Sequence, residues 1–270
     1  MIEMMRRHYG AKAWWGAFVM HSEMRHLAGI VDETYLPILR LVSDDPRQIE
    51  RDWSAIRSER WKVNWWDSPH ERWRKTYGNF VRELEWSYGE LRARLSEPDF
   101  EDLVVTSMCA RLDEWIGWTK AMMKRLDRRA PGGIAASMGG ASATTMNARA
   151  MAMVSPIVGD IEVRGVQAGL IECYIPDCAM HTVVSTERPQ TNACLYGCKA
   201  ACEAFLGPDD VMSIHFEPNL PAFDCIMRVS MDGQPADPAR RAASRKTTAR
   251  EVDAGLPALS EPACDTAPVP

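Results

Sequence analysis

Tryptophan and cysteine occupy different parts of this chain, and their separation limits how its 270 residues can be organised. All ten tryptophans lie between Trp14 and Trp118, whereas six of the eight cysteines lie between Cys173 and Cys225. Large aromatic side chains dominate the packing of cores and interfaces, while cysteine is a small residue that is often buried. We therefore expect two regions that do different jobs.

The tryptophan-rich region, residues 1–130, has the spacing of amphipathic helices. From Trp14 to Val42, apolar side chains recur mostly every three or four residues, and Pro37 is expected to kink or divide this run. Trp14-Trp15 and Trp65-Trp66 each place neighbouring rings on different faces. One ring of each pair is therefore expected to line a pocket or an interface.

Start signals divide the rest of this region into further helices. Asp44-Asp45-Pro46 combines an N-cap residue with a first-turn proline, which predicts a helix that continues through Trp61. Ser68-Pro69 with Glu71 repeats the signal before a second helix. A third helix is expected over about residues 100–126 from its apolar spacing.

The amino-acid composition changes beyond residue 130. Residues 131–150 are rich in glycine, alanine and serine, as in a flexible connection. Residues 151–232 are expected to form a small cysteine-rich α/β unit, and residues 233–270 a disordered tail because they contain few large apolar groups. The predicted fold class is therefore α+β, with a helical N-terminal half packed on this unit.

Within the α/β unit the expected elements are one strand, one helix and an antiparallel hairpin. Alternating residues predict the strand at 169–175, and the helix is expected from Thr191 to Leu206, with Thr191 or Asn192 as its N-cap. Gly207-Pro208 should end that helix. The hairpin should pair Val211–Glu217 with Cys225–Met231.

Charge and hydrophobicity exclude several classes of function. A net charge of -5 and a pI near 5.7 give no support to nucleic-acid binding. No apolar run approaches the roughly 20 residues that a membrane span requires, and the N-terminus has no secretory pattern. The sequence thus predicts a cytoplasmic protein with reduced cysteines and a small-molecule substrate, and it is compatible with a homo-oligomer.

The cysteines of the predicted helix form a stripe. Cys194, Cys198 and Cys202 recur every four residues, so their thiols should lie along one side of the helix. Two further cysteines flank a turn just upstream, and Cys225 opens the last strand. The first interpretation is packing, because small buried thiols fill the space between a helix and a sheet well.

A second interpretation is a metal site. Cys198 and Cys202, together with Cys173 or His181, could hold zinc or iron, because residues i and i+4 of a helix can bind one ion. The chain has no CxxC pair, however, so no cofactor is predicted from the sequence itself.

A third interpretation is a catalytic cysteine. It requires an accessible thiol with a lowered pKa, a proton shuttle and donors for a developing oxyanion. The sequence offers His181, Glu203, Asp177 and His215 as candidate shuttles. Glu203 directly follows Cys202 and should point about 100° away from it around the helix.

Several short segments of this region resemble the L-2-amino-thiazoline-4-carboxylic acid hydrolase family. They are Glu172-Cys173, Cys194-Leu195-Tyr196-Gly197-Cys198-Lys199-Ala200-Ala201-Cys202-Glu203, Ile214-His215-Phe216-Glu217 and Asp224-Cys225-Ile226-Met227-Arg228-Val229. The chain departs from the family pattern in two places. Pro218–Asp224 replaces a glycine turn before the final cysteine, and Cys202-Glu203 replaces a cysteine–aspartate spacing.

The resemblance implies a helical N-terminal region, a cysteine-bearing α/β end and a hydrolase. Characterised members open a cyclic amidine ring with water and give an N-carbamoyl amino acid. The expected site comprises Cys198, Cys202 and Cys225, with Glu203 or His181 as proton carriers and Asp177 as an orienting group. The function expected is hydrolysis of a C–N or C–S bond in a small cyclic molecule. The alternative is a non-catalytic small-molecule or metal-binding module in which the cysteines bind.

Overall fold

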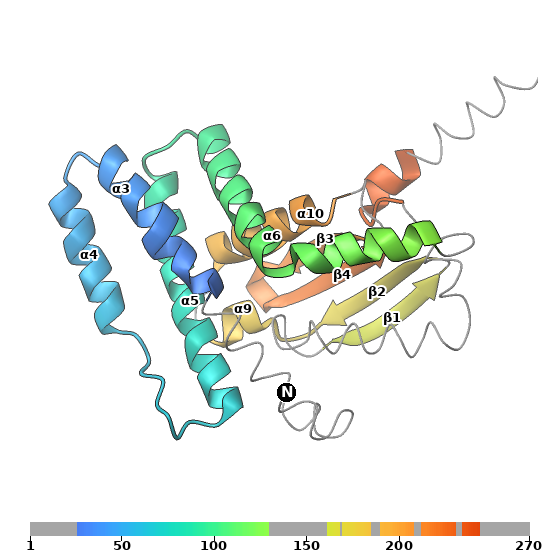
Figure 1. Cartoon of the computed structure of the whole chain (residues 1–270), viewed down its shortest axis with the longest axis horizontal. Coiled ribbons are helices and arrows are strands. Elements are labelled where there is room, and N and C mark those ends of the chain that lie inside the picture. Colours follow the sequence, from blue (N-terminus) through green and yellow to red (C-terminus); the bar gives the residue numbers. More distant parts are fainter. Residues whose placement is uncertain are drawn as a thin grey trace, which may run out of the picture.

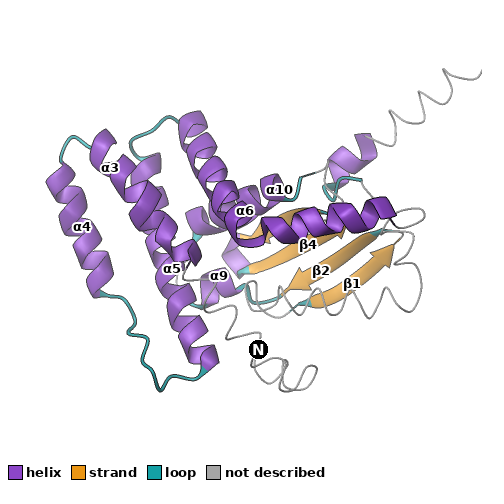
Figure 2. Ribbon diagram, in the orientation of Figure 1, coloured by secondary structure: helices purple, strands orange, loops and turns teal. Residues whose placement is uncertain are grey.

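The fold joins a group of helices to a four-stranded antiparallel sheet, which confirms the predicted α+β class. The computed structural model describes residues 26–129, 161–167, 169–184, 190–207, 212–230 and 234–243. The helices up to residue 92 lie at the left of Figure 1 and the sheet lies at the right, while the later part of the helix Glu97–Arg129 extends to the right over the sheet. Figure 2 shows the same arrangement by secondary structure.

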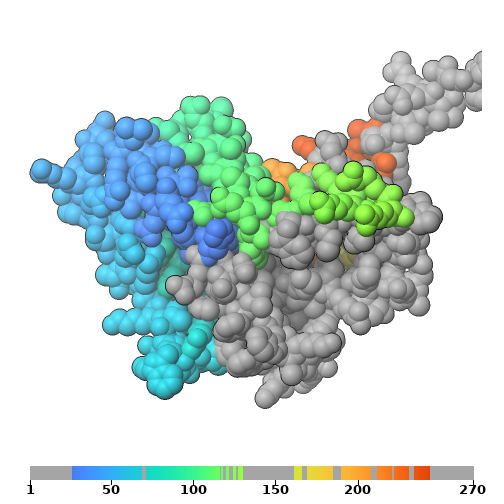
Figure 3. Space-filling view, viewed as in Figure 1, coloured from blue at the N-terminus to red at the C-terminus, as the bar shows by residue number. Residues whose placement is uncertain are grey.

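The described part of the N-terminal half contains the helical residues 26–30, followed by η1 (Val31–Tyr35, a π-helix), α3 (Leu36–Val42), α4 (Pro46–Ser58), α5 (Pro69–Arg92) and α6 (Glu97–Arg129). Helices α3 and α4 and the start of α5 form one lobe in the space-filling view (Figure 3). Residues 14–25 of the first predicted run, with the pair Trp14-Trp15, the connection 131–150 and the tail beyond residue 243 lie outside the described residues.

Local caps fix the starts of the helices as the sequence predicts. The Asp45 carboxylate accepts hydrogen bonds from the Arg47 and Gln48 amides at 3.0 and 3.1 Å, so α4 begins at Pro46. Ser68 and Glu71 form a reciprocal capping box that begins α5.

Helix α4 ends at Ser58, so the predicted continuation through Trp61 is wrong. Trp61 instead lies in the loop that leads to α5. There the Asn79 side chain accepts a hydrogen bond from the Trp61 amide and donates one to the Trp61 carbonyl. Tertiary contacts therefore hold this tryptophan, although its spacing suits a helix face. Helical residues run without a break from 26 to 42, so Pro37 does not divide this run; it lies in the first turn of α3, directly after the π-helical turn η1.

The C-terminal part contains β1 (Glu162–Gln167), β2 (Leu170–Ile175), α9 (Ala179–Thr182), η2 (Ala193–Ala200, a π-helix), α10 (Ala201–Phe205), β3 (Ser213–Asn219), η3 (Leu220–Ala222, a 3₁₀-helix) and β4 (Asp224–Ser230). The strand order is β1-β2-β4-β3. The hairpin predicted between the last two strands is confirmed as β3 and β4, which pair antiparallel.

Alternation along β2 and β4 gives the sheet one buried face. Ile171, Cys173 and Ile175 of β2 are buried, and Cys225, Met227 and Val229 of β4 lie on the same side. These side chains belong to one hydrophobic cluster with residues of α5 and α6. The helical half and the sheet therefore share a core.

The first part of η2 is held by α5. The Glu85 carboxylate accepts hydrogen bonds from the Ala193 amide at 2.7 Å and the Asn192 side chain at 3.0 Å. The N-cap predicted at Thr191 or Asn192 is therefore wrong, because a carboxylate from another helix takes that place. Gly197 allows the close approach, since a Cβ there would lie 2.6 Å from Leu84 of α5.

Strand β3 is an outer strand of the sheet, and side chains of η2 and α10 cover its free edge. Lys199 donates to the Phe216 carbonyl at 2.6 Å, and Glu203 accepts from the Phe216 amide at 2.7 Å. Lys199 and Glu203 also pair with each other at 2.7 Å. The two side chains thus satisfy backbone groups that an open edge strand would expose.

Residues 234–243, which the sequence places in the tail, pack against the sheet. Ala236 and Arg241 are buried, and the Arg241 guanidinium donates to Ser230 of β4 at 3.0 Å. The ordered part therefore extends past residue 232, because a buried arginine finds a hydroxyl partner there. Among the described helices, none is long and apolar enough to span a membrane.

Candidate functional site

A small cavity lies between the buried face of the sheet, η2 and α9, and we call it the cysteine cavity. Four cysteines line it with His181, Lys199 and Asp224, and these are Cys178, Cys194, Cys198 and Cys225. The space open to the centre of a water molecule is about 10 Å³, which is room for one water. The cavity is thus rich in thiols but closed to larger molecules.

Three of the expected site residues meet in this cavity. Cys225 comes from the start of β4, His181 from α9 and Cys198 from η2. The π-helical form of η2 was not predicted, and it places Cys194 and Cys198 in a wider turn than an α-helix has. Such turns occur frequently at functional sites.

An unusual backbone conformation lies beside the cavity. Phe223 has φ 57° and ψ 20°, and it is the one non-glycine residue with positive φ in the described segments. Its carbonyl accepts a hydrogen bond from the Cys178 amide at 2.9 Å, and its ring lies 5.4 Å from the His181 ring. A bulky residue in this region carries strain, which is most often found near functional sites.

Burial makes most of the cavity thiols poor acids. It raises the pKa of Cys225 to about 12 and that of Cys194 further above the usual value of 9.0. Burial also raises the pKa of Cys178, although the Met180 and His181 amides lower it in part. These thiols therefore stay protonated at neutral pH.

Cys202 behaves differently because of its neighbour one turn back. The Cys198 thiol donates a hydrogen bond to the Cys202 sulfur, which lowers the pKa of Cys202 and raises that of Cys198. Burial and the nearby Glu203 carboxylate act against this lowering. Cys202 does not line the cavity, but its partner does. The pair thus links the cavity to a thiol that is easier to ionise.

His181 is held in a defined form inside the site. Its Nδ1 accepts a hydrogen bond from the Gln190 amide at 2.8 Å, so the neutral ring carries its proton on Nε2. Only 2% of the residue is exposed, and burial lowers the pKa of its imidazole. His181 is therefore neutral at physiological pH, with an N–H donor on Nε2 and with Nδ1 occupied by the Gln190 amide.

Glu203 and Asp177, like Cys202, lie outside the cavity. The Glu203 carboxylate faces the edge of β3, where one oxygen contacts Lys199, the Phe216 amide and His215. Asp177 is exposed to solvent. The structure thus gives Glu203 a structural contact with the sheet and leaves Asp177 away from the cavity thiols.

Four residues that line this cavity were not predicted from the sequence as site residues: Cys178, Cys194, Lys199 and Asp224. Cys194 shares a stripe with Cys198, and that spacing was the available signal. Cys178 reaches the cavity because β2 and its turn bring it under η2, which is a tertiary effect.

Metal binding has little geometric support in this arrangement. Across the described segments, no three His, Cys, Asp or Glu side chains converge as a metal site requires. The sulfurs line the cavity as protonated thiols, and all seven described cysteines are free.

Comparison of the chain with protein-family models, with curated proteins and with solved structures gives no match.

Proposed function

We propose that this protein is a hydrolase that opens a C–N or C–S bond of a small cyclic amidine, with Cys202 as its nucleophile. The observation that supports this role is the hydrogen bond from Cys198. It gives Cys202 a lowered pKa, whereas burial or hydrogen bonding raises the pKa of the other six described cysteines. The proposal also agrees with the family that the cysteine-rich segment resembles.

The reaction has two steps and consumes one water. The Cys202 sulfur adds to the C=N carbon, the ring bond from that carbon to sulfur or nitrogen breaks, and the leaving atom takes the proton that the Cys202 thiol loses. Water then attacks the same carbon, and the bond to the Cys202 sulfur breaks. One water proton remains on the product nitrogen, and the other restores the Cys202 thiol.

Access sets the main condition on this mechanism. The closed cavity has room for one water, so a ring of several heavy atoms reaches the Cys198–Cys202 pair only when η2 moves. Movement of η2 must break the Lys199 and Glu203 bonds to β3 or carry them along. The proposed enzyme therefore has a closed resting form and a less populated open form.

The proposal is tested by incubating the purified protein with 2-amino-thiazoline-4-carboxylate and related cyclic amidines. Ring-opened product, detected by mass spectrometry, should disappear in folded Cys202→Ser and fall strongly in Cys198→Ser. Cys173→Ala is the matched control, because Cys173 is buried on the same sheet face outside the cavity. Full turnover in a folded Cys202→Ser variant, or no turnover with any substrate, would show the proposal to be wrong.

A second candidate function is a module that binds a soft metal ion. It would use the four thiols and one imidazole around the cysteine cavity, which do not converge as a metal site requires in this closed form. Binding would release protons from thiols of raised pKa, so the affinity should increase with pH. About one zinc or iron per chain in the purified protein, lost in Cys198→Ser and Cys225→Ser, would support this candidate over the hydrolase.

A further inference from the structure

A larger hollow lies along α5, and we call it the helical cleft. Its volume is about 590 Å³, within the range of small-molecule sites. Thr76, Asn79, Phe80 and Glu83 of α5 form its floor. None of the residues that line the cleft also lines the cysteine cavity, so the two are separate.

The loop before α5 forms one wall of the cleft and is fixed in place. The Asn79 side chain binds the Trp61 backbone through bonds of 2.9 and 3.0 Å, and the Trp61 ring lies over Gly78. A Cβ at Gly78 would lie 2.3 Å from that ring. Arg72 donates to the backbone carbonyls of Asp67 and Trp65. The wall is thus formed before any ligand arrives.

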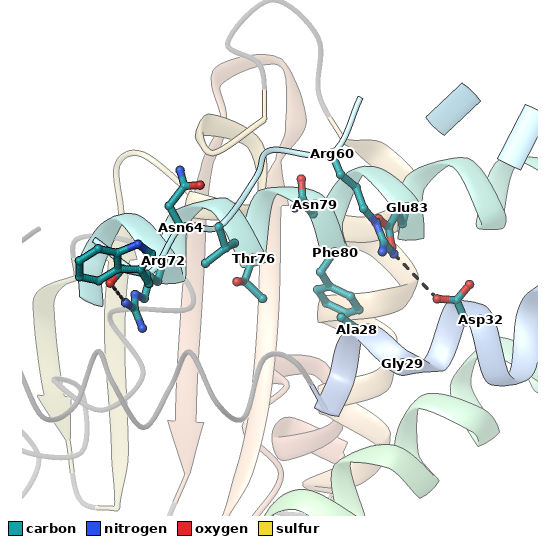
Figure 4. Close-up of a pocket in the computed structure, with 12 residues that line it drawn as sticks. Ala28, Gly29, Asp32, Arg60, Asn64, Arg72, Thr76, Asn79, Phe80 and Glu83 are labelled. Atoms are coloured by element: carbon teal, nitrogen blue, oxygen red, sulfur yellow. Dashed lines mark hydrogen bonds and ion pairs between the residues drawn. The ribbon is translucent and has the colours of Figure 1, made fainter. Parts of the chain in front are cut away.

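Charged groups gather at one end of the cleft. Figure 4 shows Arg60, Glu83 and Asp32 together there, with Arg72 at the other end and Thr76 and Asn79 between. The Glu83 carboxylate is almost fully buried and binds the Arg60 guanidinium through both oxygens. Glu83 and Arg60 therefore satisfy each other.

Asp32 is the acceptor that remains open to a ligand. Its carboxylate lies 3.6 Å from Arg57 and 3.8 Å from Arg60, both longer than a hydrogen bond, and its side chain is 37% exposed. No hydrogen bond joins it to another described residue. A ligand with N–H groups would supply the bonds that the two arginines do not make.

An exposed aromatic ring lines the cleft elsewhere. Trp65 is 82% exposed, although Arg72 binds its carbonyl, and Phe80 on the floor is buried. A large exposed indole on a fixed loop offers a surface on which a flat ring can stack. The face of an indole also attracts cations.

From these groups we infer that the helical cleft binds an elongated planar cation, an amine or amidine carried on an aromatic body. The floor runs from Arg72 to Glu83, a length of about 16 Å along the helix. The aromatic body stacks on Trp65, and the N–H groups bind Asp32. The Asp32 carboxylate disfavours a second carboxylate at the same position, whereas Glu83 is already neutralised by Arg60.

The test uses three probes of one shape, 4-phenylbenzamidine, 4-phenylbenzamide and 4-phenylbenzoate, in titration calorimetry with the full chain. The amidine should bind saturably and at least about tenfold more tightly than the benzoate. Asp32→Asn should weaken amidine binding by about tenfold, the loss expected for one charge-assisted hydrogen bond. Trp65→Ala should weaken it by about fivefold.

Two variants control for general effects. Trp66→Ala removes the neighbouring ring, which is also exposed but does not line the cleft, and Glu50→Gln removes a carboxylate that pairs with Arg40 elsewhere. Both should change amidine affinity by less than about twofold. Tighter binding of the benzoate, equal losses in Trp65→Ala and Trp66→Ala, or no saturable amidine binding would overturn the inference. Amidine binding in Cys202→Ser should be unchanged, because this site does not depend on the proposed hydrolase.

Discussion

The cysteine cavity and the helical cleft share no lining residue, and they differ in the space and in the chemical groups that they offer to a ligand. The cavity holds thiols and an imidazole but has room for about one water, whereas the cleft has about 590 Å³ and contains no cysteine. Burial raises thiol pKa values in the first, while the second keeps a carboxylate partly exposed. Reactive groups and available space thus lie in different parts of the molecule.

Helix α5 nevertheless serves two purposes. Leu84 and its neighbours join the helical half to η2, and Asn79 and Glu83 hold the loop that forms the cleft. The first face contributes packing and the second contributes polar contacts. Substitutions on the first face should therefore act on stability, and those on the second on binding.

The largest effect is expected from Leu84→Ala. Leu84 is fully buried against Gly197, and its truncation should lower the free energy of unfolding by about 3 kcal/mol through lost burial and a new cavity. Urea denaturation followed by circular dichroism measures this loss. Leu41→Ala is the control, because Leu41 is 84% exposed and should change stability by less than about 0.5 kcal/mol. Similar losses in both variants would show that α5 does not join the two halves.

Gly197→Ala should have the next largest effect. A Cβ at this position would lie 2.6 Å from Leu84, so η2 or α5 must shift, at a cost of about 2 kcal/mol in unfolding free energy. Gly165→Ala is the control in the same denaturation series, because no atom lies within 4 Å of its added Cβ. A Gly197→Ala variant as stable as the native chain would mean that η2 is packed more loosely than described.

Glu85→Ala should cost about 1.5 kcal/mol, because it leaves the Ala193 amide and the Asn192 side chain without their shared acceptor. Thermal denaturation checks this value. Glu90→Ala on the same helix removes a surface pair with Arg94 and should cost less than about 0.5 kcal/mol. If the two losses are equal, the first turn of η2 does not depend on α5.

The smallest effect concerns pH. The pKa of His181 is lowered by burial in the folded state, so below its ordinary value of 6.5 the unfolded chain binds more protons. Stability contributed by neutral His181 is therefore complete above pH 6.5 and is lost as the pH falls through the lowered pKa. The loss should not exceed about 1.4 kcal/mol per pH unit. Denaturation of the native chain and of His181→Gln between pH 7.5 and 5.0 should show a weaker pH dependence in the variant.

The sequence predicts features whose cause is local. Asp45 and Ser68 begin their helices through bonds to amides two or three residues away, and such signals are readable in one pass. The N-cap expected at Thr191 or Asn192 failed because Glu85, more than one hundred residues earlier, supplies the acceptor. That contact exists only after α5 and η2 pack together.

In the candidate site, too, the sequence predicts only the features whose cause is local. The four-residue spacing correctly predicted that the side chains of Cys198 and Cys202 lie on one side of the helix, where they interact. The spacing could not show that the turn after β2 brings Cys178 under η2. Glu203 follows a cysteine of interest, yet it faces the edge of β3 because adjacent helical residues diverge. The helical cleft depends on the path of the loop across Gly78, and in the sequence only the pair Trp65-Trp66 indicated a pocket there.

The cysteine cavity has room for about one water when it is closed, so chemical modification of its thiols can measure how often it opens. A reagent such as iodoacetamide is larger than one water, so it can modify Cys194 or Cys225 only during moments when η2 has moved from the sheet. When closing is faster than modification, the observed rate divided by the rate for an unprotected thiol equals the fraction of time spent open. Mass spectrometry of each cysteine at increasing reaction times would then give the free energy that separates the closed form from the form that admits a substrate.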